Sequence, residues 1–331
     1  MTQKPEFAGQ NRPGAGIAFI VVAFVAISIN DMLIKQLSGG YPLHQIVLIR
    51  SGIGIFFSLL LVQWEGGWTI LKTATPGLHL LRGLLIVCSN MTYFVALAAI
   101  PLADATALFY VAPLMITLLS IPMLGEKVGP MRLGACAVGF LGVLVMVEPW
   151  AEAEARKAPL WILCLPVVAA FTYAMNQVLT RKLGAVSKAS AMAVYIQATF
   201  IVVSAGFWVF AGDGRYAEGL DSPSLQFLLR AWVWPQGIDI WLLAGLGATS
   251  AVIGYCISAA YRLAEAATVA PFEYTGLPLA ILWGWVIWGE LPGPWVMVGI
   301  VLIVGAGLFV FVREQQKKRP VVSARRVHRR Y

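Results

Sequence analysis

Long apolar runs, separated by short polar connectors, follow one another along almost the whole chain. A membrane-spanning helix needs about 20 consecutive, mainly apolar residues. The pattern predicts ten such helices, at 15–37, 43–63, 77–99, 102–124, 131–148, 159–181, 190–211, 239–262, 266–288 and 295–313. The alternation of apolar and polar residues that marks membrane β-barrel strands is not found. The chain is therefore predicted to be an all-α membrane protein with ten transmembrane helices.

Composition excludes most other classes of protein. Of the 331 residues, 59% are hydrophobic and 12% are charged, and the mean hydropathy is +0.78. A soluble domain carries about 25% charged residues, so a soluble enzyme or a nucleic-acid-binding protein is excluded. The four cysteines and three histidines lack metal-ligand spacing, so neither a metal site nor a cofactor is predicted. The motifs of a phosphate-binding loop, a metalloprotease and a serine hydrolase are missing, which argues against ATP-driven transport and against an enzyme.

Basic residues gather on one side of the predicted helices. With both termini in the cytoplasm, 18 of the 24 lysines and arginines lie on the cytoplasmic side and 4 on the outer side. Because basic residues favour cytoplasmic loops, the sequence predicts a multi-pass protein of a bacterial inner (plasma) membrane with both termini cytoplasmic. The basic tail at 314–331 is expected to be attracted to anionic lipid. Residues 225–234 are expected to form either an interfacial helix on the outer surface or an irregular loop.

The chain repeats its own pattern. Residues Asn30–Leu37 parallel Asn176–Leu183, and Gly125-Glu126 parallels Gly289-Glu290. Each copy holds five predicted spans, and an odd number forces the second copy to enter from the opposite face, so the repeats are expected to be inverted. The predicted division is an N-terminal cytoplasmic segment (1–14), a first five-helix repeat (15–148), a second five-helix repeat (159–313) and a basic cytoplasmic tail (314–331).

Inverted repeats are typical of secondary transporters, whose halves open to either side of the membrane around a central site. The sequence therefore predicts alternating-access transport of a small solute. The alternatives are a duplicated structural membrane protein, a passive channel, and a membrane enzyme acting on a lipid-linked substrate. Within transport, the alternative is a proton-coupled exporter of amino acids or drugs.

Several stretches resemble the EamA family of the drug/metabolite transporter superfamily. The resemblance rests on Arg82-Gly83-Leu84-Leu85, on Ile100 to Glu126, and on Leu263 through Glu273-Tyr274 to Glu290. It covers nearly the whole chain and implies a ten-helix secondary carrier of small metabolites with a central cavity. The Asn30-Asp31 pair and the Arg82-Gly83 start of the third helix are most similar to the branch that contains S-adenosylmethionine and riboflavin uptake carriers.

Asp31 and Arg50 are ionisable residues within predicted spans, where a charge costs at least about 2.5–3.5 kcal/mol. Both lie about 10 Å from the same membrane surface, so they could pair across two helices. Their repeat equivalents are Gln177 and Gln197, and losing both charges together is what a pair permits. The readings left open are a structural ion pair, a local Asp31–Lys35 pair, or contact with a solute or a coupling proton.

Glu273 lies seven residues into the ninth predicted helix, between Pro271 and Pro278. The repeat places Tyr110 opposite Tyr274. Helices broken by proline at matching depths in two halves are the expected position of a solute site. Glu273 is therefore predicted to bind solute or to carry a proton, and the alternative is a carboxylate held for packing alone.

Mid-span polar and aromatic side chains complete the predicted site. A single one is more often an interhelical hydrogen-bonding group than a ligand, but as a set they exceed what packing requires. The predicted substrate-binding residues are Glu273, Tyr274, Tyr110, Asp31, Arg50, Asn30, Asn90, Tyr93, Asn176, Gln177 and Tyr255. Aromatic faces suit a planar or cationic solute. The expected partners are a small-molecule solute and membrane lipid, with proton coupling as an option, in a monomer or a homodimer.

Two further features concern how helices end and pack. Glu126 and Glu290 stand at helix C-termini, where a carboxylate opposes the helix dipole and needs a Lys, an Arg or a backbone donor. Either one could serve as a gate latch. Glycines of the fifth and tenth helices, including Gly142 and Gly299, are predicted to allow close helix packing.

Overall fold

The computed structural model describes residues 13–125, 128–152, 158–183, 189–263 and 270–318. These residues form helices and connecting loops, and nine of the described helices are long and apolar enough to cross a membrane. The prediction of an all-α, multi-pass membrane protein is confirmed for this part of the chain. Residues 1–12 and 319–331, which carry most of the predicted cytoplasmic segments, lie outside the described residues, as does Glu126.

The helices follow the predicted order with small changes at their ends. They are α1 (Pro13–Leu37), α2 (Leu43–Glu65), α3 (Pro76–Leu97), α4 (Leu102–Phe109), α5 (Ala112–Leu124), α6 (Pro130–Val147), α7 (Leu160–Leu183), α8 (Ala189–Ala211), α9 (Pro223–Leu229), α10 (Asp239–Leu263), α12 (Gly276–Trp288) and α13 (Pro294–Lys318), with the 3₁₀ helices η1 (Trp68–Leu71) and η3 (Ala270–Thr275).

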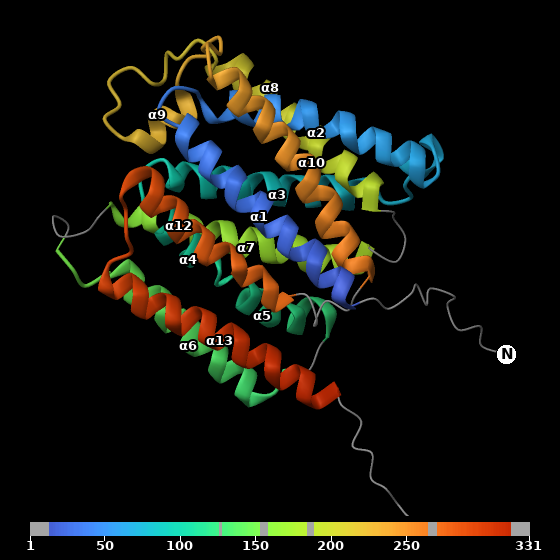
Figure 1. Ribbon diagram of the computed structural model, residues 1–331, viewed down its shortest axis with the longest axis vertical. Coiled ribbons are helices and arrows are strands. Elements are labelled where there is room, and N and C mark those ends of the chain that lie inside the picture. Colours follow the sequence, from blue (N-terminus) through green and yellow to red (C-terminus); the bar gives the residue numbers. More distant parts are fainter. Residues whose placement is uncertain (1–12, 126–127, 153–157, 184–188, 264–269, 319–331) are drawn as a thin grey trace, which may run out of the picture.

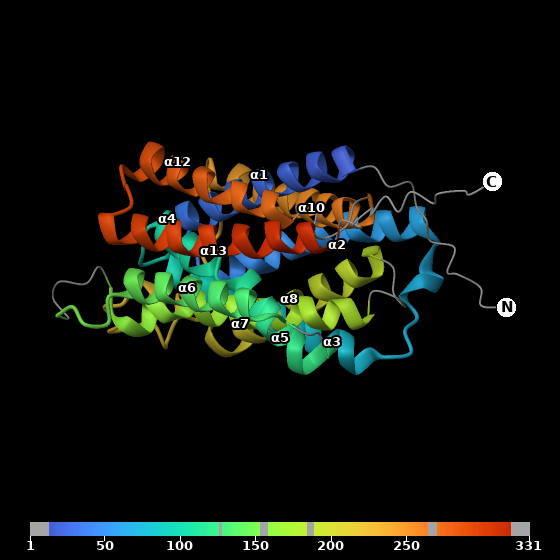
Figure 2. The same cartoon turned by 90° about the horizontal axis from the view of Figure 1, so that it is seen from below.

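The long helices lie side by side in one bundle (Figure 1). Helices α6 and α13 pack together along one edge, and α2 and α8 pack together along the opposite edge. Between them, α1 packs along α10, and α3 packs along α7. Helix α1 begins and α13 ends at the same end of the bundle (Figure 2). We call the opposite end, where α1 ends and α2 begins, the α1–α2 end.

Two of the ten predicted spans are broken. The predicted helix 102–124 divides into α4 and α5 at Tyr110, and the described part of 266–288 consists of η3 followed by α12. Pro113 and Pro271 have no N–H to donate, which weakens a continuous helix at both places. Helix α12 has 13 residues, too few to cross a bilayer unaided.

Glycines hold α6 and α13 close together, as the sequence predicted. A side chain at Gly142 would meet the main-chain oxygen of Gly299 at 3.0 Å, and one at Gly299 would meet the oxygen of Gly142 at 2.8 Å. A methyl group at either position would force the helices apart, because packed interiors have no spare space.

Residues 225–234, expected to form either an interfacial helix or an irregular loop, divide between the two. Helix α9 begins at Pro223 and ends at Leu229. Phe227 is fully buried, and the Ser224 hydroxyl donates to the Val95 oxygen at the end of α3 over 2.6 Å. The helix therefore packs against the α1–α2 end of the bundle through Phe227 and Ser224, and residues 230–234 lie outside any helix.

Candidate functional site

A small pocket lies where α1, α4 and α12 meet, between the two predicted repeats. It is lined by Ile27, Ser28, Asp31, Leu102, Thr106, Tyr110, Gly276 and Ala280. Its volume is about 10 Å³, which is room for roughly one water molecule. The helices therefore leave little empty space at this point.

Asp31 faces this pocket from α1 and is connected to α3 and α4. Tyr93 donates a hydrogen bond to the Asp31 carboxylate over 3.3 Å, and its hydroxyl lies 3.0 Å from that of Thr106. Thr106 in turn donates to the Leu102 oxygen over 2.7 Å. Tyr93 is buried, so Asp31 has a fixed polar neighbour on one side and the pocket on the other.

Arg50 is buried in α2 and is held by neutral groups. Its guanidinium donates to the side-chain oxygens of Asn30 at 3.3 Å and Asn90 at 3.4 Å. It also lies over the rings of Phe94 and Phe200, at 5.7 and 5.2 Å from the ring centroids. Such contacts favour a cation.

The direct ion pair considered between Asp31 and Arg50 does not form. The two charges attract one another, but their hydrogen bonds go to Tyr93 and to the two asparagines. Asn30 connects Arg50 to α10, because its amide also donates to Thr249 of α10 over 3.2 Å.

The two tyrosines that the repeat aligned lie against each other. The rings of Tyr110 and Tyr274 are 5.4 Å apart and nearly perpendicular. The Tyr110 hydroxyl donates to the main-chain oxygen of Glu273 over 3.0 Å. Glu273 is half-buried in η3, and its main-chain oxygen and its neighbour Tyr274 bring it next to Tyr110.

A row of aromatic rings connects Tyr93 to α7. Phe109 packs against Tyr93 at 5.4 Å and against Tyr173 at 5.3 Å. The Gln177 amide donates to the Tyr173 hydroxyl over 2.6 Å. Gln177 is thereby connected to Tyr93 and Asp31 through Tyr173 and Phe109. The sequence predicted Gln177, Tyr93 and Asp31 as site residues but did not predict Phe109.

Of the predicted residues, only Asp31 and Tyr110 line the pocket itself, and two others also lie outside the contacts just described. Tyr255 is 42% exposed on α10 and packs edge-on against Phe19, at a centroid distance of 6.0 Å. Asn176 is buried on α7, outside the pocket lining.

The sequence also missed pocket residues. Thr106, Ser28 and Gly276 all line the pocket. Thr106 stands four residues before Tyr110, and this helical spacing to a predicted ligand could have indicated it. Ser28 and Gly276 carry no comparable signal, because small residues are frequent in every membrane helix.

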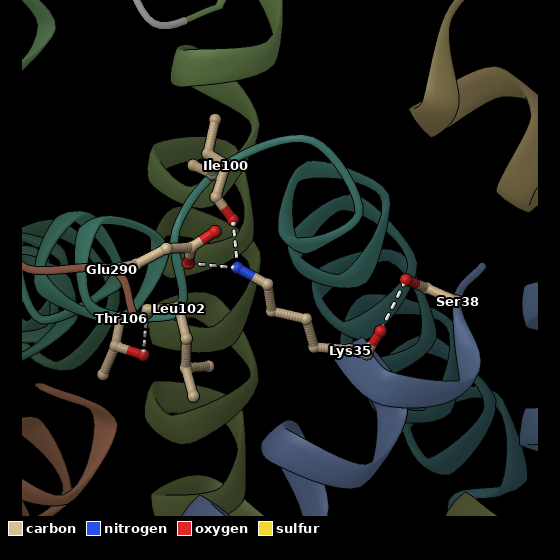
Figure 3. A network of polar contacts seen from close by, with 6 residues as sticks. All are labelled: Lys35, Ser38, Ile100, Leu102, Thr106 and Glu290. Carbon is tan, nitrogen blue, oxygen red and sulfur yellow. Dashed lines mark hydrogen bonds and ion pairs between the residues drawn. The ribbon is translucent and has the colours of Figure 1, made fainter. Parts of the chain in front are cut away.

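Lys35 does not form the local pair with Asp31 that its spacing allowed. Its ammonium lies 2.8 Å from the carboxylate of Glu290, just after α12, and donates to the Ile100 oxygen over 3.2 Å (Figure 3). Asp31 therefore bonds to Tyr93 and lines the pocket instead.

These contacts make a closed centre with chemistry for holding a small organic molecule. Acids at Asp31 and Glu273 can bind a cation or a proton, aromatic rings can stack on a planar group, and the amides near Arg50 can hydrogen-bond. Among the described residues no cluster of metal ligands is found.

The EamA-like transporter family matches residues 14–148. A riboflavin transporter of Vibrio cholerae is 32% identical over 307 residues, covering 92% of this chain and 93% of that protein. This chain belongs to the EamA-like transporter family. The resemblance seen in its sequence motifs is thereby confirmed.

Other similarities of this EamA-family chain extend over nearly its full length. An S-adenosylmethionine uptake transporter of Rickettsia prowazekii is 25% identical and covers 91% of this chain and 94% of that protein. A solved structure that is 20% identical matches with a TM-score of 0.62, covering 92% of this chain and 99% of the other, and shows a shared fold.

Proposed function

We propose that this EamA-family chain is a secondary active transporter that moves a small organic metabolite across a bacterial inner membrane by alternating access. A riboflavin-like solute is favoured, with an S-adenosylmethionine-like solute next. The observation that carries the proposal is the set of acids and tyrosines, Asp31, Tyr93, Tyr110, Glu273 and Tyr274, gathered where the two repeats meet.

Inverted repeats are the first part of the proposal. Under the repeat, α1 corresponds to α7 and α3 to α10. Two-fold symmetry then requires that α7 pack against α3 as α1 packs against α10, and both contacts occur. Helix α2 corresponds to α8 and α6 to α13, and each of these helices also packs against its own equivalent. Contact between the equivalent residues Tyr110 and Tyr274 supports a two-fold axis passing between them.

Alternating access is the second part. A pocket with room for one water cannot hold a metabolite, so binding requires the halves to separate. Breaks at Tyr110 and in η3 supply positions where α4 and α12 can bend. Asp31, which lines the pocket, gives a cationic solute or a proton a reason to bind there, because a charge in the membrane needs a counter-charge.

Orientation follows from basic residues. We place the α1–α2 end on the outer side and both termini in the cytoplasm, since basic residues concentrate in the predicted cytoplasmic connectors. Alkaline phosphatase fused within 212–222 is expected to be active, and the same fusion after residue 318 is expected to be inactive. The reverse result would overturn this orientation.

The choice of solute rests on relatives and on chemistry together. The 32% identical relative is named a riboflavin transporter, and the 25% identical one an uptake transporter of S-adenosylmethionine. A flavin is planar and uncharged, so it would use the tyrosine rings and the amides near Arg50. S-adenosylmethionine is cationic, so it would need Asp31 or Glu273.

The test is flux into proteoliposomes of purified protein. Labelled riboflavin is expected to enter, and unlabelled riboflavin trapped inside is expected to accelerate that entry, as a carrier does and a channel does not. Replacing Asp31→Asn should change riboflavin uptake by less than about threefold but should weaken S-adenosylmethionine binding by about tenfold or more, the effect of losing roughly 1.4 kcal/mol. Failure of both solutes to enter would reject this solute class.

Proton-coupled export of amino acids or drugs is the second candidate, and the acid of Glu273 favours it. A pH gradient would then drive solute efflux from cells, and Glu273→Gln would abolish the effect of the gradient while leaving solute exchange intact. Flux that is independent of pH in the unmodified protein would reject this candidate.

A further inference from the structure

Lys35 and Glu290 join the two halves at the α1–α2 end. Lys35 stands in the last turn of α1, and Glu290 follows α12. Their charged atoms are 2.8 Å apart, with side-chain exposures of 10% for Lys35 and 35% for Glu290 (Figure 3). A pair so shielded from water is far less screened than one on the surface.

The end of α12 fixes the position of Glu290. Gly289 has a left-handed backbone, with φ of 67°, and its N–H bonds to the Trp285 oxygen while that of Glu290 bonds to the Gly284 oxygen. The bond from the left-handed Gly289 to Trp285 is that of an αL cap. It leaves a carboxylate beside the negative end of the helix dipole, which is unfavourable without a cation. Lys35 supplies that cation from the other half.

Lys35 also contacts residues that lie next to the pocket lining. Its ammonium donates to the Ile100 oxygen over 3.2 Å and lies 4.8 Å from the centre of the Trp288 ring. Ile100 stands two residues before Leu102, which lines the pocket together with Thr106. Movement of α12 away from α1 would therefore break the ion pair next to the residues that line the pocket.

Neighbouring contacts at the same end also cross between the halves. Tyr41 donates to the Asp239 carboxylate over 2.7 Å, and Gln45 makes two hydrogen bonds with the main chain of Val233. These contacts tie α1 and α2 to the start of α10 and its preceding loop, whereas the Lys35–Glu290 pair ties α1 to α12. If this end opens by movement of α12 away from α1, Lys35 and Glu290 must separate.

We propose that the Lys35–Glu290 ion pair is the latch that holds the α1–α2 end closed over the pocket and that it breaks each time this end opens. The proposal rests on the alternating-access function proposed above. The latch sets the balance between states, because removing one member leaves the other without its counter-charge and removes the attraction that the closed state alone supplies.

Labelling of a pocket cysteine tests the latch without any solute. Ser28 lines the pocket and is buried, so Ser28→Cys reports access to it. A membrane-impermeant maleimide is applied to intact cells and to inverted vesicles, and the signal of the protein with its native cysteines alone is subtracted. Glu290→Gln and Lys35→Met should each raise the labelling rate from the face that carries residues 212–238 by about tenfold, a typical conformational coupling.

Charge reversal and a matched control complete the experiment. The double variant Lys35→Glu with Glu290→Lys should return the labelling rate to within about threefold of the unmodified protein, because the attraction is restored. Asp213→Asn removes an exposed ion pair with Arg215, inside one loop, and should leave labelling unchanged. If the Glu290→Gln or Lys35→Met protein does not accumulate in the membrane, Glu290→Asp is used instead, and a smaller increase in labelling rate is expected.

Unchanged labelling in the single variants, or an increase only from the opposite membrane face, would overturn the latch. So would a charge-reversed protein that labels as fast as the singles. Because labelling needs no solute, these outcomes leave the transport proposal to the flux measurement. A failure of riboflavin and S-adenosylmethionine flux would likewise leave the labelling result standing.

Discussion

Tyr110 donates its hydroxyl hydrogen to the main-chain oxygen of Glu273 over 3.0 Å, and this bond joins the break in one half to the break in the other. Tyr110 ends α4, and Glu273 lies in η3. A carbonyl outside a regular helix cannot stay unpaired within a membrane. The tyrosine therefore satisfies the broken backbone while closing one side of the pocket.

Replacing Tyr110→Phe should lower the free energy of unfolding by about 1–3 kcal/mol, since it leaves a buried carbonyl without its donor. Solute flux should fall as well, because η3 loses its anchor. Denaturation in detergent and proteoliposome flux measure the two effects. Tyr255→Phe is the matched control, because Tyr255 is exposed and packs only its ring edge against Phe19. Equal losses from both variants would contradict this role.

The charges of Asp31 and Arg50 should be coupled although they do not touch. Asp31→Asn and Arg50→Met should each destabilise the protein, because each leaves the other charge without its electrostatic partner. The double variant should be more stable than the sum of the single losses by about 0.5–3 kcal/mol. Thermal unfolding of all four proteins gives the coupling, and strictly additive losses would argue against it.

Two glycines of α13 should respond in opposite ways to alanine. A side chain at Gly307 would collide with the Tyr274 hydroxyl, whereas Gly305 has open space beside it. Gly307→Ala should destabilise by about 1–3 kcal/mol through overpacking. Gly305→Ala should be neutral or should stabilise by up to about 1 kcal/mol through helix propensity. Melting temperatures of the two variants test the difference, and a Gly307→Ala variant as stable as Gly305→Ala would refute the close contact.

Closure of the α1–α2 end should weaken at high pH through Tyr41. Burial and the hydrogen bond to Asp239 raise the pKa of the Tyr41 hydroxyl above its ordinary value. The folded protein therefore holds this proton more tightly than the unfolded chain. The stabilisation is present below the unfolded pKa of about 10 and is lost as pH rises through the folded pKa.

Thermal unfolding between pH 8 and pH 11, roughly the range around that pKa, measures this effect. Tyr41→Phe should be less stable than the unmodified protein at the lower pH, and the two should converge as pH rises. A gap that widened with pH would show that another group is responsible.

Much of the fold could be predicted because its signals are local. Apolar runs of about 20 residues mark spans in any context, and nine of the described helices qualify. The Gly289-Glu290 end of a helix was also visible, since glycine adopts the left-handed conformation at little cost. Prolines near Tyr110 and Tyr274 also indicated breaks in the two spans that carry them. The sequence did not indicate the burial of α9, because that burial depends on neighbouring helices.

The candidate site divides in the same way. Asp31, Arg50, Glu273 and the aligned tyrosines stood out because charged and polar groups are rare inside spans. Their partners did not stand out. Spacing allowed Asp31 to pair with Lys35, yet Lys35 meets Glu290, 255 residues further along the chain. Helix packing brings such distant groups together, and no local pattern records which groups will meet.

The sequence by itself determined that this chain is a helical, multi-pass membrane protein of the EamA family, since hydrophobic length and motif are properties of the chain alone. Only the tertiary structure decided that Arg50 is held by asparagines, that Tyr110 serves the backbone of Glu273, and that Lys35 meets Glu290. The physical reason is that a buried polar group must satisfy itself with whatever packing places within reach, and packing is fixed by the whole bundle.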